Sequence, residues 1–66
     1  MTNEEMMEIA RSGVERNGLE VDPEDGPDAV YDDVYTSAFD ALVDRGVDQA
    51  TAGEVASELA QGYAQP

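Results

Sequence analysis

The chain has 66 residues and carries 16 Asp and Glu against only three basic residues, which gives a formal net charge of −13 at pH 7. That length suffices for one small domain, close to the lower limit for a single hydrophobic core. The basic residues are Arg11, Arg16 and Arg45, so the chain lacks Lys as well as His and Cys. This composition excludes disulfides and imidazole or thiolate metal sites, and it removes the usual nucleophiles and general bases. We expect a noncatalytic protein without a cofactor or metal site.

The charge and the apolar runs also restrict the environment of the chain. Residues 1–8 are acidic, whereas a signal peptide begins with a basic stretch, and no apolar run approaches the roughly 20 residues of a membrane span. The carboxylates should repel nucleic-acid phosphates and anionic lipids. We expect a soluble protein of the cytoplasm or a virion. Its partner should be another protein or a second copy, with cations of the medium bound only nonspecifically.

The acidity also bears on the solvent. At about 0.15 M salt the Debye length is about 8 Å, so neighbouring carboxylates repel, and at about 1 M it falls to about 3 Å. The Asp- and Glu-rich, Lys-free composition, with mostly Val and Ala as aliphatics, resembles proteins of salt-in halophilic archaea and their viruses. That resemblance implies a high-salt environment. The alternative is an acidic mesophilic protein that lacks Lys.

The first predicted helix covers residues 3–16. Thr2 and Glu5 have the spacing of a capping box, and Asn17 with Gly18 is a good stop signal. One narrow apolar face recurs at helical spacing: Met6, Ile9, Ala10, Gly13 and Val14.

Residues 19–27 are predicted to form an acidic loop, because two prolines disfavour regular structure there. Six carboxylates lie within twelve residues: Asp22, Glu24, Asp25, Asp28, Asp32 and Asp33. An EF-hand loop needs Gly at its sixth position, and aligning Gly26 there puts Val21 where a carboxylate is required. We therefore expect a solvated loop rather than a calcium site.

The second predicted helix covers residues 28–45, with Asp28 as its cap and Gly46 as a left-handed stop. Its apolar band is wider than one small partner helix needs: Val30, Tyr31, Val34, Tyr35, Ala38, Phe39, Ala41, Leu42 and Val43.

The third predicted helix covers residues 48–61, with Asp48 as its cap, and Gly62 is expected to end it. Thr51 and Glu54 offer a second capping box, so a start at Thr51 is the alternative. A stripe of mostly small residues permits close helix approach: Ala52, Val55, Ala56, Leu59 and Ala60. The patterns predict an all-α fold, a single three-helix bundle with a long central helix.

The segment from Gly46 to Val55 resembles the turn and second helix of a helix-turn-helix. A recognition helix there would carry Asp48, Glu54 and Glu58 and no basic residue, so nothing would pair with phosphate. A plain helical hairpin is the favoured alternative. Gly46 and Val47 also resemble the Gly–aliphatic loop of ubiquitin-associated three-helix domains, a resemblance confined to that loop.

Four aromatic residues provide the candidate contact surface, and three of them lie on the second predicted helix. An aromatic body with a polar tip suits an interface, although core packing is the alternative. The predicted contact residues are Val30, Tyr31, Val34, Tyr35, Phe39 and Tyr63.

Leu, Ile, Val and Phe total only 12 of the 66 residues, which predicts a small core. We expect that salt, self-association or a larger assembly stabilises the fold. The leading hypothesis is a noncatalytic structural or adaptor protein, such as a virion subunit, in a high-salt environment. The alternative is an acidic regulator or inhibitor that imitates nucleic acid toward a basic protein. A helix-turn-helix regulator is a distant third.

Overall fold

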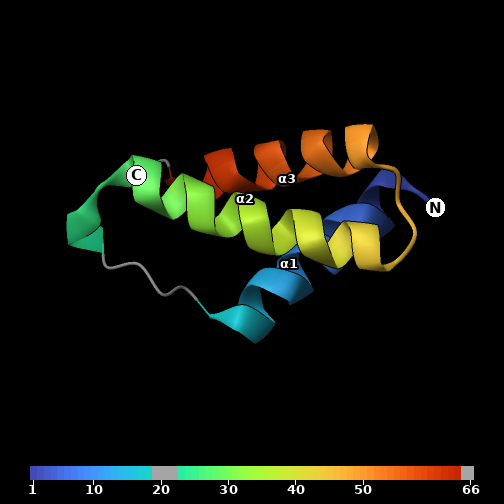
Figure 1. Cartoon of the computed structure of the whole chain (residues 1–66), viewed down its shortest axis with the longest axis horizontal. Coiled ribbons are helices and arrows are strands. Elements are labelled where there is room, and N and C mark those ends of the chain that lie inside the picture. Colours follow the sequence, from blue (N-terminus) through green and yellow to red (C-terminus); the bar gives the residue numbers. More distant parts are fainter. Residues whose placement is uncertain (19–22, 65–66) are drawn as a thin grey trace.

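A computed structural model of the chain describes residues 1–18 and 23–64, and all regular secondary structure within them is helical. The all-α, three-helix fold predicted from the sequence is confirmed (Figure 1). The elements are α1 (Asn3–Asn17), a short 3-10 helix η1 (Pro23–Asp25), α2 (Pro27–Asp44) and α3 (Gln49–Ala64).

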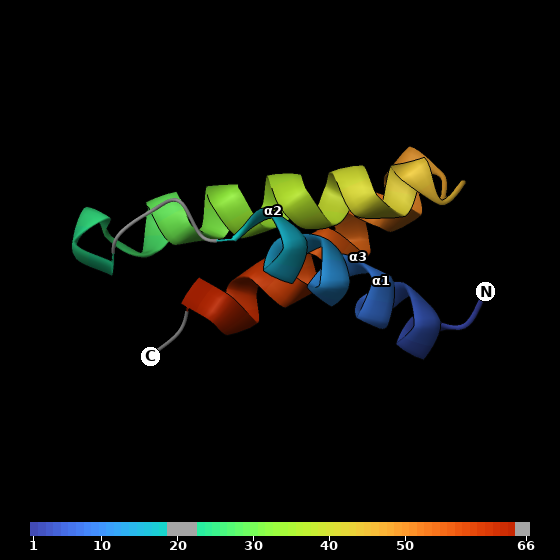
Figure 2. The same cartoon turned by 90° about the horizontal axis from the view of Figure 1, so that it is seen from below.

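Helix α2 packs against both other helices, most extensively against α3. Figures 1 and 2 show α3 returning along α2 as an antiparallel hairpin, while α1 crosses α2 obliquely. At 18 residues α2 is only slightly longer than α3, which has 16. The pairing of α1 with α3 is the least extensive of the three. None of the described helices has both the length and the apolar character to cross a lipid bilayer.

Helix α1 begins at the predicted cap and ends one residue beyond the predicted range. The main-chain N–H of Glu5 donates to Thr2 Oγ1 at 3.2 Å, and the Thr2 hydroxyl donates in turn to Glu5 Oε1 at 3.2 Å. At the other end Gly18 takes a φ of 71° and its N–H bonds to the Val14 carbonyl at 2.9 Å. Both ends are therefore set by local sequence.

Helix α2 begins one residue earlier than predicted, and the prediction of Asp28 as its cap is wrong. Gly26 occupies the cap position with a φ of 100° and no side-chain cap bond, and Pro27 is the first helical residue. Proline suits that place because its fixed φ is helical and its missing N–H would lack a helical partner anyway. Asp28 therefore lies inside the first turn, where its charge faces the positive end of the helix dipole.

The end of α2 is a Schellman motif, with Gly46 in the left-handed conformation predicted for it, at a φ of 93°. The N–H of Gly46 bonds to the Val43 carbonyl at 3.0 Å, and that of Val47 to the Leu42 carbonyl at 3.0 Å. Val47 also packs against the core cluster that contains Leu42. The helix itself ends at Asp44, one residue before the predicted end at residue 45.

Helix α3 starts at Gln49, because Asp48 Oδ2 accepts the main-chain N–H of Thr51 at 3.0 Å. The cap predicted at Asp48 is confirmed, and the alternative start at Thr51 is not adopted. The predicted end at residue 61 is wrong, since α3 continues through Gly62 to Ala64. Among the described residues only Gly18, Gly26 and Gly46 have positive φ, so Gly62 does not form a left-handed stop.

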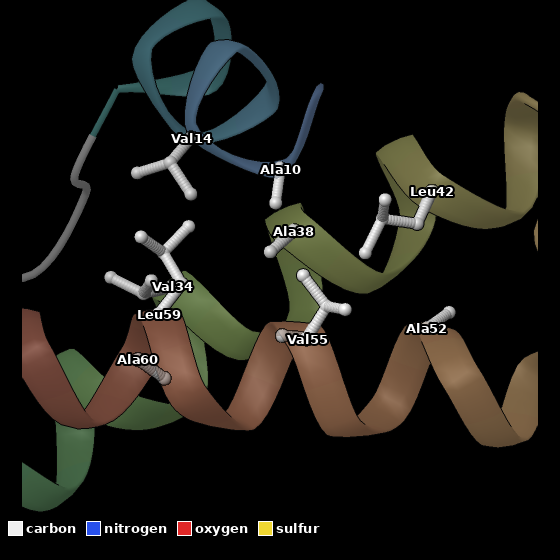
Figure 3. Packing of buried hydrophobic residues seen from close by; sticks show 10 residues of the cluster. Ala10, Val14, Val34, Ala38, Leu42, Ala52, Val55, Leu59 and Ala60 are labelled. Carbon is white, nitrogen blue, oxygen red and sulfur yellow. The ribbon is translucent and has the colours of Figure 1, made fainter. Parts of the chain in front are cut away.

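The core is small and rich in alanine. Its side chains converge from all three helices (Figure 3), and Leu42 and Val34 are the largest that are fully buried. All five residues of the predicted α3 stripe lie in it. The cluster comprises Ala10, Val14, Val34, Ala38, Leu42, Ala52, Val55, Ala56, Leu59 and Ala60.

The closest approach of α1 to α2 depends on Gly13. A Cβ atom added there would lie 2.5 Å from the Ala41 Cβ and 3.2 Å from the Ser37 carbonyl oxygen. Neither neighbour is the far end of a flexible side chain, so the helices themselves would have to separate.

We expect Gly13→Ala to destabilise the fold by about 1–3 kcal/mol, because overpacking at this crossing outweighs the gain in helix propensity. Gly62→Ala is the matched control. Nothing lies within 4 Å of a Cβ at Gly62 inside α3, so this change should stabilise by about 0.5–1 kcal/mol. Urea unfolding of both variants at one fixed salt concentration measures the effects, and stabilisation by both would contradict the close crossing.

The cap at Asp48 should make stability depend on pH. Hydrogen bonds from the main-chain N–H of Thr51, and then from its hydroxyl, lower the pKa of the Asp48 carboxyl below its usual 3.8. The stability from this cap is therefore present above the unfolded pKa and is lost as pH falls through the lower folded pKa. The native chain should melt at a higher temperature than Asp48→Asn, and this difference in melting temperature should shrink below about pH 4. A Glu24→Gln control shows the effect of removing one exposed charge that caps nothing.

Candidate protein-contact surface

Three aromatic side chains form a continuous stack along α2, which we call the aromatic ladder: Tyr31, Tyr35 and Phe39. The ring centroids of Tyr31 and Tyr35 are 6.0 Å apart with planes at 18°, and those of Tyr35 and Phe39 are 6.0 Å apart at 13°. A spacing of four residues places successive rings one above the other on one face of a helix. The ladder is therefore a continuous strip of aromatic surface.

The ladder meets α3 through small and polar residues. The Tyr31 hydroxyl and Ser57 Oγ form a hydrogen bond of 2.7 Å, and Gln61 Nε2 donates to the same Ser57 oxygen at 3.4 Å. Tyr35 lies opposite Gly53, where an added Cβ would come within 3.1 Å of its hydroxyl oxygen. All three ladder residues are half-buried, so the ladder joins α2 to α3 while keeping part of its surface open.

The other predicted contact residues lie in different surroundings. Val34 is fully buried among the core residues, so it does not reach the surface of the bundle. Val30 is half-buried and packs against the core. Tyr63 is 37% exposed and lines a different hollow, between α1 and α3. The structure thus brings together the three ladder residues, with Val34 behind them in the core and Tyr63 apart.

Beside the ladder lies an open hollow, which we call the ladder hollow. Tyr35 is its one contribution from α2, and its acidic lining residues are Glu54 and Glu58, with no basic residue among them. The lining residues are Tyr35, Gln49, Ala50, Gly53, Glu54, Ser57, Glu58 and Gln61. An aromatic ring beside carboxylates and an amide can accept hydrogen bonds and attract a cation.

The sequence analysis did not predict that Gly53 and Ser57 contact the aromatic ladder. Together with Gln61 they recur every four residues on α3, a signal for one helix face. That pattern does not reveal which face of α2 lies opposite, because Tyr31 and Ser57 are 26 residues apart in the chain.

The acidic loop offers no evident metal site in its described part. Within residues 1–18 and 23–64, no group of three or more acidic side chains is placed to hold a metal ion. Glu24 and Asp25 are exposed on η1, whereas Asp22 lies outside the described residues.

The α2–α3 unit has the form of a helical hairpin, since the two helices pack along each other (Figure 1). This geometry favours the hairpin over the crossed helices of a helix-turn-helix. Against known proteins, neither a family model, nor a curated protein, nor a solved structure matches this chain.

We expect Tyr31→Phe to cost about 1 kcal/mol of unfolding free energy, because the bond to Ser57 is lost while the ring remains. In a double-mutant cycle with Ser57→Ala, the second change should cost much less once the first is present. Tyr63→Phe, which removes the same atom from an exposed ring, should be close to neutral. Fully additive losses at Tyr31 and Ser57 would contradict this contact, and chemical unfolding measures all four variants.

Proposed function

We propose that this chain is a noncatalytic structural or adaptor protein that acts by protein–protein contact in a high-salt environment. The observation that carries the proposal is the distribution of its apolar side chains. Five of the ten core residues are alanine, and only five are larger. Eight larger hydrophobic side chains are half-buried around that core instead: Met6, Met7, Ile9, Val30, Tyr31, Tyr35, Phe39 and Val47.

This distribution supports assembly because more large apolar side chains lie at the edge of the core than inside it. Burial of apolar surface stabilises by about 25 cal/mol per Å², so covering these edges would add stability that the alanines cannot supply. The aromatic ladder and the ladder hollow form the proposed contact surface. A subunit of a larger assembly such as a virion fits a chain with so small a core.

The charge supports the high-salt part of the proposal. A net charge of −13 on 66 residues opposes compaction at low ionic strength, and the only counter-charges are three arginines. Screening at molar salt shortens the range of this repulsion to about 3 Å. The same small core is then adequate.

The second candidate is an acidic inhibitor that occupies the basic cleft of a nucleic-acid-binding protein. The observation in its favour is that exposed carboxylates lie on all three helices, for example Glu8 on α1, Asp40 on α2 and Glu54 on α3. Helices hold these charges in fixed positions, as a mimic of phosphates requires.

We expect helix content, followed by circular dichroism, to rise between about 0.1 and 3 M KCl as screening removes the repulsion. Neutralising three exposed carboxylates in Glu4→Gln, Asp32→Asn and Asp44→Asn together should lower the KCl concentration needed for half of the gain. The matched control changes the same three residues but keeps their charge, with Glu4→Asp, Asp32→Glu and Asp44→Glu. It should fold at the same KCl concentration as the native chain.

Light scattering after size separation at high salt tests assembly on the same samples. We expect a species larger than a monomer, and Tyr35→Ser should reduce it. A chain that is fully helical at 0.1 M and strictly monomeric at 3 M would overturn the proposal. A monomer that binds a basic protein, and binds it less tightly as salt rises, would favour the inhibitor.

A further inference from the structure

The three arginines of the chain gather on one surface of the fold. Arg11 and Arg16 lie on α1 and Arg45 caps the end of α2, and all three are exposed. In the part of the chain that the structure describes, none of them forms an ion pair with a carboxylate. They line one hollow, which we call the arginine hollow, together with Glu5, Glu8, Ile9, Ser12 and Glu15. Its three arginines and three glutamates balance.

Balanced charge makes the arginine hollow unlike the rest of the surface. All basic side chains of the chain line it, so the whole net charge of −13 lies outside it. An acidic partner, a second copy included, is therefore repelled least at this hollow, where unpaired guanidinium groups can donate to its carboxylates. In Figure 2 α1 crosses in front of the hairpin of α2 and α3, so its exposed side is open to such a partner.

Four residues of the arginine hollow follow one line along α1, and we call them the α1 stripe: Glu5, Ile9, Ser12 and Arg16. Successive members are four, three and four positions apart, which places them on one face of the helix. Glu5, Ser12 and Arg16 are exposed, and Ile9 is half-buried. The spacing is the same when it is read from either end. The stripe therefore matches itself when a second α1 runs antiparallel to the first.

We propose that the α1 stripe is a docking surface for a second copy of this chain, related by a two-fold axis that sets the two α1 helices antiparallel. Glu5 of each copy then lies opposite Arg16 of the other, and Ile9 lies opposite Ser12. A two-fold interface uses the same surface on both copies, so each of these pairs forms twice. The acidic first turn of one α1 meets the basic last turn of the other, which is the complementarity that identifies a second copy as the occupant.

Salt decides whether two such acidic chains can meet. The bundle is 17 Å across in its narrowest dimension, so most carboxylates of two docked copies lie well apart. At about 1 M salt the Debye length is about 3 Å, so their repulsion is screened, whereas charges in direct contact still attract. The inference therefore rests on the proposed high-salt environment. One helix from each copy makes a small interface, so we expect a weak dimer whose population depends on protein concentration.

Charge reversal tests the pairing in the full chain at about 1 M KCl, where circular dichroism first verifies that each variant is helical. Glu5→Arg and Arg16→Glu each place like charges opposite one another at both ends of the stripe. Each alone should weaken dimer formation at least about tenfold. An equal mixture of the two variants restores both opposite-charge pairs. Light scattering should therefore give twice the monomer mass for the mixture, at concentrations where neither variant alone is dimeric.

The matched control is Glu4→Arg, which makes the same change of charge one residue away, outside the lining of the arginine hollow. Both variants are titrated into fluorescently labelled Arg16→Glu chain, and anisotropy reports binding. Glu5→Arg should bind at least about tenfold more tightly than Glu4→Arg, because only the former places a positive charge opposite the reversed residue. Equal binding of the two would show diffuse attraction and overturn the proposal, as would a mixture of Glu5→Arg and Arg16→Glu that stays monomeric.

A second substitution separates this dimer from assembly through the aromatic ladder. Tyr35 lines the ladder hollow and not the arginine hollow, so adding Tyr35→Ser to both charge-reversed chains should leave their pairing unchanged. Loss of pairing on that change would place the second copy on the ladder and overturn the proposal. Helix content that does not depend on KCl, or assembly that does not depend on Tyr35, would count against the proposed function while the reversed chains still pair.

Discussion

The close approach of the helices through small side chains is the constraint on which the rest of this structure depends. At Gly13 the α1 backbone lies so near Ala41 that one extra carbon does not fit, and α3 presents alanines toward α2. Close approach increases dispersion contacts between backbones, which partly replaces the large side chains that the core lacks. Because the gain comes from proximity, any force that separates the helices acts directly on stability. The repulsion among 16 carboxylates is such a force.

A core filled by small residues leaves the larger apolar side chains at the edges of the bundle. The aromatic ladder fills the edge between α2 and α3, where the Tyr31–Ser57 hydrogen bond fixes its position. Met7 and Tyr63 lie at the edge between α1 and α3, where the pairing is weaker. An open hollow lies at each edge, lined by Tyr35, Gly53 and Ser57 at the first and by Met7, Leu59 and Tyr63 at the second. Both hollows therefore lie beside large side chains that the core of small residues leaves at its edge.

Features encoded by neighbouring residues could be predicted, while those set by backbone angles or distant contacts could not. The caps at Thr2 and Asp48 and the stop at Gly46 follow from side chains within a few residues. Gly62 has the same identity as Gly46, but its φ is not positive, and residue type alone does not decide between these conformations. The burial of Val34 and the bond from Tyr31 to Ser57 depend on how α2 is rotated against α3. The rotation of α2 about its own axis is set by the packing of the whole bundle. The aromatic spacing therefore predicted a surface on α2 but did not predict which α3 residues contact it.

Salt acts in opposite directions on folding and on recognition in such a chain. Raising the ionic strength relieves repulsion within the bundle, yet it also weakens attraction toward a basic partner beyond a few ångströms. Long-range steering by the total charge therefore contributes least at high ionic strength. What remains is contact at short range, through apolar side chains and carboxylates that touch the partner directly. Burial of apolar surface is not weakened by screening, so the half-buried side chains around the core, such as Met7 and Tyr35, can contribute to a contact at any salt concentration.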